Sequence, residues 1–143
     1  PPQKLNGYDK KIRRISLSSD ESPSWLKFNR LFAFENNGTL LGVSFITTGY
    51  ETQDAVINSL SYKLGHEGSS EEYVLRNNFG TEFIVKWVNW RGRDIKAEYR
   101  PSVNIYDSSL NDLESAEVIY ETEEGREYRE SIQTKISNRT RSL

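Results

Sequence analysis

The segment from Arg30 to Thr47 carries the strongest local constraint in the chain, because Asn37 and Gly38 separate two runs rich in apolar residues. Both central positions of a type I′ turn need a positive φ, which asparagine tolerates and glycine adopts freely. A two-residue turn here predicts a β-hairpin with one register and one apolar face, which we expect to pack on a core. The predicted pairs are Phe34 with Leu41, Phe32 with Val43, Arg30 with Phe45, Ala33 with Gly42, and Leu31 with Ser44.

The composition fits one domain with a small core. The chain has 143 residues, of which 35% are hydrophobic, and its net charge is −2. An acidic chain has no general attraction for nucleic acid, so we expect no nucleic-acid partner. Cysteine is absent, which excludes a disulfide framework, a thiolate zinc site and a cysteine nucleophile. No apolar run approaches the length of a membrane span.

Residues 48–65 have the pattern of an amphipathic helix. Thr48 and Glu51 have the spacing of a capping box, and Gly65 can take the left-handed position after the last turn. Lys63 falls in that last turn, where a cation favours the helix dipole. One apolar stripe of this helix comprises Val56, Ile57, Leu60 and Leu64.

A second hairpin is predicted over Phe83 to Arg100, with its turn at Arg91-Gly92 and a polar loop before it at residues 66–78. Both of its faces carry large apolar groups, so we expect it to lie centrally in the sheet. The predicted pairs are Val88 with Ile95, Lys86 with Ala97, and Ile84 with Tyr99, whereas Phe83, Val85 and Trp87 fall on the opposite face.

The two ends of the chain differ from this central part. Residues 1–29 are polar and predict an N-terminal arm, with a strand at Arg13–Leu17. Glu124-Gly125 can turn a third hairpin, whereas Tyr128, Ile132 and Ile136 recur at helical spacing, and the pattern leaves both alternatives open. Between these ends and the second hairpin, we expect an extended run at Val103–Tyr106, a short helix capped by Ser109 with Asp112 at N3, and a strand at Val118–Thr122.

Hairpins joined by short turns, together with one amphipathic helix, predict an α+β fold. We expect an antiparallel sheet built from hairpins, with the main helix packed on one face. The predicted organisation is a polar arm at residues 1–29, an α+β domain at residues 30–122, and a charged, partly ordered or flexible segment at residues 123–143.

Five segments occur in order within roughly residues 30–110: LFAFENNGTLLGVSF, LSYKLG, NNFGTEF, KWVNWRGRDIKAEY and IYDSSL. This arrangement resembles small secreted or periplasmic bacterial proteins of unknown function. Such proteins carry a cleaved signal peptide, and a chain that starts at Pro1 without methionine fits a processed product. The resemblance therefore implies a periplasmic or secreted location, although Lys63-Leu64-Gly65 stands where those proteins usually have Lys-Tyr-Gly. It implies no site residue.

Two groups of side chains have the chemistry of catalytic sites. His66 is the one histidine, and a helix-end histidine that interacts with terminal carbonyls is the simpler account of it. Paired carboxylates can cleave glycosides, but acids beside a turn are typically solvated. The acids in this second group are Glu117, Glu121, Glu123 and Glu124. We expect no cofactor, no metal site and no enzymatic activity.

The segment KWVNWRGRDIKAEYR, at residues 86–100, is the strongest candidate binding surface. Trp87 and Trp90 are three residues apart on a strand, so they point to opposite faces, and at least one of them can be exposed near the turn. Arg91, Arg93 and Lys96 surround them, and exposed Trp and Arg dominate binding hot spots. The alternative is that Trp87 lies in the core and that the N-terminal arm partly covers Trp90.

These observations predict a non-enzymatic binding or protein-interaction domain of the bacterial cell envelope, whose partner is another envelope protein. The second hypothesis is a small-molecule or glycan-binding module that uses the cleft between helix and sheet or the tip of the Trp90 hairpin. The third hypothesis is a hydrolase.

Overall fold

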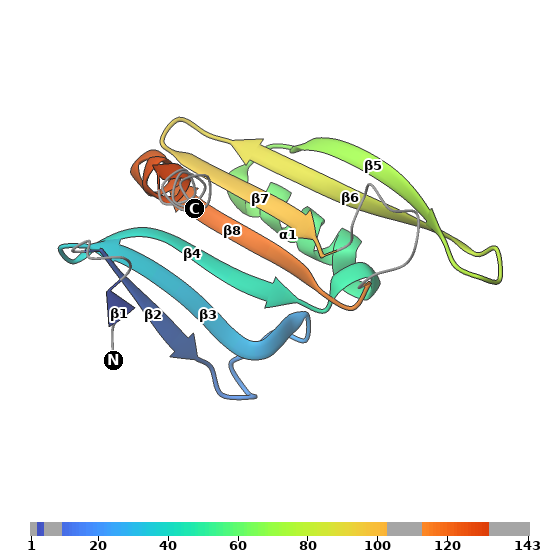
Figure 1. Cartoon of the computed structure of the whole chain (residues 1–143), viewed down its shortest axis with the longest axis horizontal. Coiled ribbons are helices and arrows are strands. Elements are labelled where there is room, and N and C mark those ends of the chain that lie inside the picture. Colours follow the sequence, from blue (N-terminus) through green and yellow to red (C-terminus); the bar gives the residue numbers. More distant parts are fainter. Residues whose placement is uncertain (1–2, 5–9, 103–112, 132–143) are drawn as a thin grey trace, which may run out of the picture.

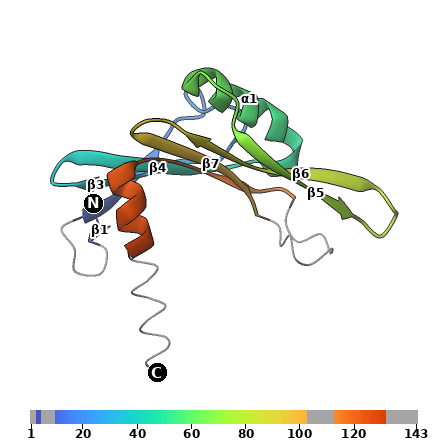
Figure 2. The same ribbon diagram turned by 90° about the horizontal axis from the view of Figure 1, so that it is seen from above.

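The computed structural model describes residues 3–4, 10–102 and 113–131. They form an eight-stranded antiparallel sheet with a helix on each face (Figures 1 and 2). The predicted α+β class, the hairpin-built sheet and the main helix on one face are therefore confirmed. The elements are β1 (Gln3–Lys4), β2 (Lys10–Ser16), β3 (Leu26–Asn36), β4 (Thr39–Thr47), the 3₁₀ turn η1 (Gly49–Thr52), α1 (Gln53–Leu64), β5 (Ser69–Arg76), β6 (Glu82–Arg91), β7 (Ile95–Pro101), β8 (Ala116–Thr122) and a C-terminal helix at residues 123–131.

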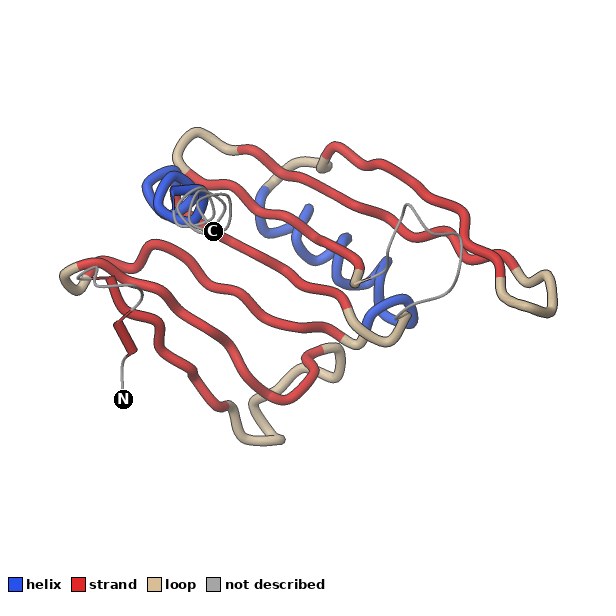
Figure 3. The backbone as a smooth tube through the Cα atoms, in the orientation of Figure 1, coloured by secondary structure: helices blue, strands red, loops and turns tan. Residues whose placement is uncertain are grey.

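The sheet consists of two meanders, β1 to β4 and β5 to β8, in the order β1-β2-β3-β4-β8-β7-β6-β5. The chain leaves β4 through η1 and α1 and enters β5 at the far edge of the sheet (Figure 3). It then returns strand by strand until β8 pairs with β4. The last strand therefore joins the two meanders, and β5 remains at an edge.

The first hairpin has the predicted turn. Asn37 and Gly38 have φ angles of 51° and 82°, as a type I′ turn requires. Asn36 lies opposite Thr39 across this turn, so the two-residue loop is confirmed.

Beyond the turn, the register differs from the prediction by one residue. Leu41 forms a β-bulge, so Phe34 lies opposite Gly42 rather than opposite Leu41. A Cβ atom at residue 42 would lie 2.3 Å from the Phe34 ring, so the ring covers a position that only glycine fits. The predicted register therefore holds only beside the turn, where Glu35 lies opposite Leu40. The pairs predicted beyond the bulge were wrong, including Phe32 with Val43, Arg30 with Phe45, Ala33 with Gly42, and Leu31 with Ser44.

The second hairpin turns two residues later than predicted. The backbone N–H of Gly92 donates to the carbonyl oxygen of Ile95 at 2.8 Å, which leaves Arg93 and Asp94 as the turn. Val88 consequently lies opposite Tyr99 instead of Ile95, so the predicted pairs were wrong. This shift places the large Trp90 side chain opposite the small Ala97, which leaves room for the indole in the core.

A strand, β5, replaces most of the polar loop predicted at residues 66–78. It pairs with β6 along its whole length, and its other edge has no strand partner among the described residues. An edge strand buries few of its side chains, so it needs few apolar residues. In β5 only Leu75 is fully buried, at 2% exposure. The side chain of Asn77 accepts hydrogen bonds from the N–H groups of Phe79 and Thr81, both at 2.9 Å, and so forms the turn into β6.

Helix α1 has the predicted C-terminus but a different N-terminus. Gly65 has a φ of 79°, and its N–H donates to the Ser61 carbonyl at 2.9 Å. Thr48 makes no side-chain capping bond because η1 intervenes, and its hydroxyl contacts that of Thr52. The apolar stripe of α1 packs on β6, β7 and β8. The buried cluster there comprises Val56, Val88, Trp90, Ala97, Tyr99, Ala116 and Val118, with Ile57, Leu60 and Leu64 packed against it.

The described parts of both chain ends belong to the folded unit. Strand β2 contains most of the strand predicted at Arg13–Leu17 and pairs with β3, so the expected arm is part of the sheet. Strand β8 confirms the strand predicted at Val118–Thr122, and residues 123–131 follow the helical alternative. Residues 103–112, Ile132 and Ile136 lie outside the described residues. In the described part of the chain, no helix is long and apolar enough to cross a membrane.

Candidate functional site

An apolar hollow of about 450 Å³ lies between α1 and the β2 to β4 side of the sheet. This volume falls within the range of small-molecule sites. The hollow exists because α1 packs mainly on β6, β7 and β8. Its lining residues are Leu17, Pro23, Trp25, Leu26, Leu31, Val43, Phe45, Val56, Ser59, Leu60, Lys63, Leu64 and Tyr120.

The connection between β2 and β3 closes one side of this hollow. It rises on the same side of the sheet as α1 (Figure 2). The carbonyl of Trp25 accepts a hydrogen bond from the Thr48 N–H at 2.9 Å, which ties the connection to the start of η1. The Trp25 ring packs on Phe45, with ring centroids 5.3 Å apart. The connection therefore supplies an aromatic wall opposite the helix.

Several apolar side chains of the hollow are only partly buried, although they pack against the core. They include Trp25, Phe45, Leu60 and Leu64. Apolar side chains on a concave wall remain in contact with water here. The free energy falls when an apolar molecule covers them. The hollow therefore has the surface chemistry of a site for an apolar ligand.

Three polar side chains also line the hollow. Ser59 and Lys63 are one turn apart on α1, and Tyr120 comes from β8. Lys63 makes no ion pair with any residue that the structure describes. An ammonium group beside an apolar wall can pair with an anionic end of a ligand.

A second hollow, of about 530 Å³, lies at the end of the β6–β7 hairpin and is polar. It is lined by His66, Glu67, Ser69, Asn89, Trp90, Arg91 and Lys96. Three residues of the predicted binding surface, Trp90, Arg91 and Lys96, therefore do come together. Arg91 and Lys96 lie opposite each other in the strand pair, whereas Arg93 is exposed in the turn.

Trp90 is not an exposed binding residue. Its side chain is 1% exposed, and the indole N–H donates to the Ser61 hydroxyl of α1 at 3.0 Å. The expectation of an exposed Trp90 was therefore wrong, and the side chain is covered by α1 rather than by the N-terminal arm. A residue near a hairpin tip is expected to be exposed, but helix α1, from an earlier part of the chain, lies over the tip of this hairpin.

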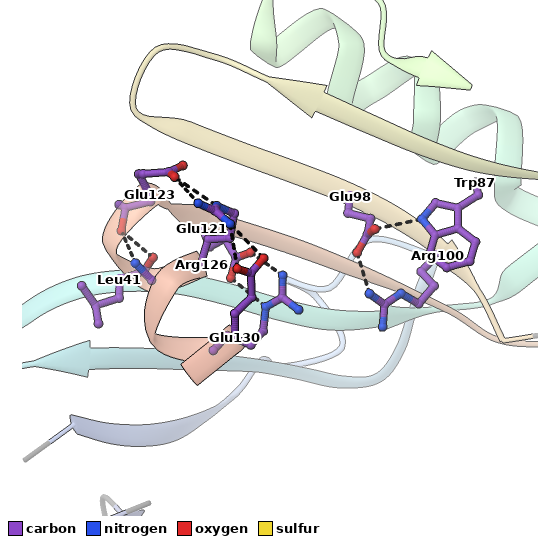
Figure 4. Close-up of polar contacts among 11 residues, drawn as sticks. Leu41, Trp87, Glu98, Arg100, Glu121, Glu123, Arg126 and Glu130 are labelled. Carbon is purple, nitrogen blue, oxygen red and sulfur yellow. Dashed lines mark hydrogen bonds and ion pairs between the residues drawn. The ribbon is translucent and has the colours of Figure 1, made fainter. Parts of the chain in front are cut away.

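Trp87 is partly buried on the opposite face of the sheet. Its indole N–H donates to Glu98 at 2.8 Å, and the Arg100 guanidinium lies 5.4 Å from the centre of its ring (Figure 4). Arg100 also donates to Glu98 at 2.8 Å. The indole, the carboxylate and the guanidinium form one polar network, so Trp87 is not part of the buried cluster under α1.

The acidic residues near the C-terminal helix form ion pairs. Glu121 is 2% exposed, and its two carboxylate oxygens accept from Arg129 at 3.1 and 2.7 Å. This burial corrects the expectation that Glu121 is solvated. Glu123 pairs with Arg126, which also pairs with Glu130 (Figure 4).

The hydrogen bond from Arg126 holds the pKa of Glu123 below its ordinary value. Glu117 is partly buried, whereas Glu124 is exposed. The carboxylates of Glu121 and Glu123 are therefore each engaged by an arginine of the C-terminal helix.

His66 lies just beyond α1, and its Nδ1 atom is 3.2 Å from the Leu64 carbonyl oxygen. This contact confirms the interaction with a helix-terminal carbonyl. No group of three or more His, Asp or Glu side chains among the described residues is arranged to hold a metal ion.

The fold and the hollow define this chain as an α+β protein with a broad antiparallel sheet and an apolar cavity beside its main helix. No protein-family model matches the chain, and searches of curated proteins and of solved structures found no match either. The resemblance to secreted bacterial proteins stays a prediction. Trp25 was missing from the predicted site, although a single tryptophan in the polar segment 18–25 was a visible signal.

Proposed function

We propose that this protein binds a small apolar molecule with an anionic end in the hollow between α1 and the β2 to β4 side of the sheet. The observation that carries the proposal is the partly buried apolar lining of a space of about 450 Å³. Removing apolar surface from water is favourable by about 25 cal/mol for each Å², and an empty hollow forgoes this free energy. A bound apolar molecule recovers this free energy.

The polar groups favour a ligand with two chemically different ends. The rings of Trp25 and Phe45 suit an alkyl chain or an aromatic body. Lys63 is the only charged residue among the lining residues, and it lies on the exposed side of α1. A carboxylate or sulfonate at the mouth of the hollow would pair with its ammonium group while remaining partly in water. Medium-chain fatty acids have this combination of groups.

The test uses a dye with the same chemistry, 1-anilinonaphthalene-8-sulfonate, whose fluorescence rises in an apolar environment. We expect the protein to bind the dye and decanoic acid to displace it. Val43→Phe places a larger ring into the hollow from β4 and should weaken dye binding at least about tenfold, with an unchanged far-UV circular dichroism spectrum.

Two further variants separate the charged contact from the apolar one. Lys63→Gln should weaken the binding of decanoic acid about fivefold, which is the contribution of one exposed ion pair. The affinity for the neutral decanol should stay unchanged. Tyr62→Gln is the matched control, because Tyr62 is next to Lys63 on α1, is 89% exposed and does not line the hollow. Equal dye affinity in wild type and Val43→Phe would contradict the proposal.

A further inference from the structure

The outer edge of β5 is a long and regular strand edge. The sheet ends at β5, which forms one margin of the molecule in the described part of the chain (Figure 1). Its 8 residues pair with β6 in one unbroken register, without a bulge. Proteins usually protect such an edge with charged side chains, above all lysine, or with proline, a bulge or a very short strand. The sequence SSEEYVLR has no proline, no lysine and no bulge, and its charged residues have both signs, two glutamates and one arginine.

The side chains of β5 alternate between the two faces of the strand. Glu72, Val74 and Arg76 share one face, and Tyr73 and Leu75 share the other. Val74 is 56% exposed and lies opposite Ile84 of β6, which is 45% exposed. An apolar strip therefore crosses the hairpin and reaches the free edge, with a negative residue on one side of it and a positive residue on the other.

This charge pattern complements itself under two-fold symmetry. Two copies that pair their β5 strands antiparallel about a two-fold axis place one residue opposite its own counterpart at the centre. With Val74 at the centre, Glu72 faces Arg76 of the second copy and Tyr73 faces Leu75 of the second copy.

The neighbouring registers are worse. A centre at Tyr73 places Glu72 against Val74, and a centre at Leu75 places Val74 against Arg76. Only the register centred on Val74 joins opposite charges to each other and apolar residues to each other.

We propose that two copies of this chain associate edge to edge through β5, antiparallel and centred on Val74, so that their sheets become one continuous sheet. Arg76 already pairs with Glu82 of its own β6 at 2.7 Å, in an exposed position. Its guanidinium has five N–H donors, so it can also donate to Glu72 of the second copy. The interface therefore has an ion pair on each side of an apolar centre, in addition to main-chain hydrogen bonds.

Sedimentation equilibrium of the full chain tests this proposal. Wild type should reach twice the mass of the 16.6 kDa chain. Glu72→Lys brings two positive charges together at both ends of the interface, and Arg76→Glu brings two negative charges together. Each variant should raise the dimer Kd at least about tenfold. An equimolar mixture of the two variants should form a heterodimer of wild-type affinity, because every facing pair is again opposite in charge.

Glu71→Lys is the control with the same charge change on the neighbouring residue, which does not face Arg76 in this register. It should leave the dimer Kd unchanged. A wild type that stays monomeric at all concentrations would overturn the proposal. So would a dimer that Glu72→Lys and Arg76→Glu do not weaken, because that dimer uses another surface, or variants that fail to pair when mixed. Val74→Lys, which places two ammonium groups at the two-fold axis, gives a second test and should also yield monomers.

Discussion

The burial of Trp90 makes the replacement of this side chain the sharpest test of the fold. Trp90 is 1% exposed and belongs to the cluster between α1 and the β6 to β8 half of the sheet. Replacing a fully buried tryptophan by alanine removes its contacts and leaves a cavity, which costs about 3–5 kcal/mol. In a chain of 143 residues this loss corresponds to a fall in Tm of about 10–20 °C.

Urea unfolding followed by far-UV circular dichroism measures this effect without relying on tryptophan fluorescence. Trp90→Ala should lower the free energy of unfolding by about 3–5 kcal/mol. Trp90→Phe keeps an aromatic ring but loses the bond to Ser61, and should cost about 1–2 kcal/mol. Tyr62→Ala is the control, since Tyr62 is 89% exposed on the same helix and should change stability by less than about 0.5 kcal/mol. A loss below about 1 kcal/mol in Trp90→Ala would refute the buried position and support an exposed binding surface instead.

Two further predictions concern buried polar groups. Arg129→Leu leaves Glu121, at 2% exposure, without its ion-pair partner and should cost about 3–5 kcal/mol in urea unfolding. Adding Glu121→Leu should recover most of that loss, and a double variant as unstable as the single one would contradict the ion-pair explanation. Burial raises the pKa of Tyr99 from 10.0 to about 12. Both the folded and the unfolded chain keep this proton below pH 10, and above pH 10 the unfolded chain loses it first, so the free energy of unfolding should fall by about 2 kcal/mol between pH 10 and 12. Tyr99→Phe should remove this part of the pH dependence in alkaline unfolding, and an unchanged slope would show that other groups cause it.

The sequence alone determined the features that depend on short-range sterics. The turn at Asn37-Gly38 and the left-handed end of α1 at Gly65 have positive φ angles, which these residue types accept with little strain. The apolar stripe of α1 likewise follows from the helical period. From these elements the α+β class could be predicted, because hairpins and one amphipathic helix have few ways to bury their apolar faces.

Long-range packing decided the register of the first hairpin. Leu41 forms a bulge where the C-terminal helix begins. Its carbonyl oxygen accepts a hydrogen bond from the Thr122 hydroxyl at 3.1 Å, and a Cβ atom at Gly125 would lie 2.5 Å from the same oxygen. The segment at residues 122–125, more than eighty residues away, therefore fixes the backbone at Leu41. No pattern in the sequence around Leu41 could predict this bulge.

The tertiary structure also decided where the candidate site lies. Trp90 looked exposed beside its turn, but α1 covers it, whereas Trp25 lies in a polar segment and becomes a wall of the hollow. Strand β5 lies at the end of the sheet and six of its eight residues are exposed, two of them serines and three charged, so its sequence resembled a loop. A sequence specifies which residues are apolar and where the chain can turn. Which apolar face α1 covers, and which it leaves open as a hollow, depends on the pairing of β8 with β4 and on contacts between distant segments.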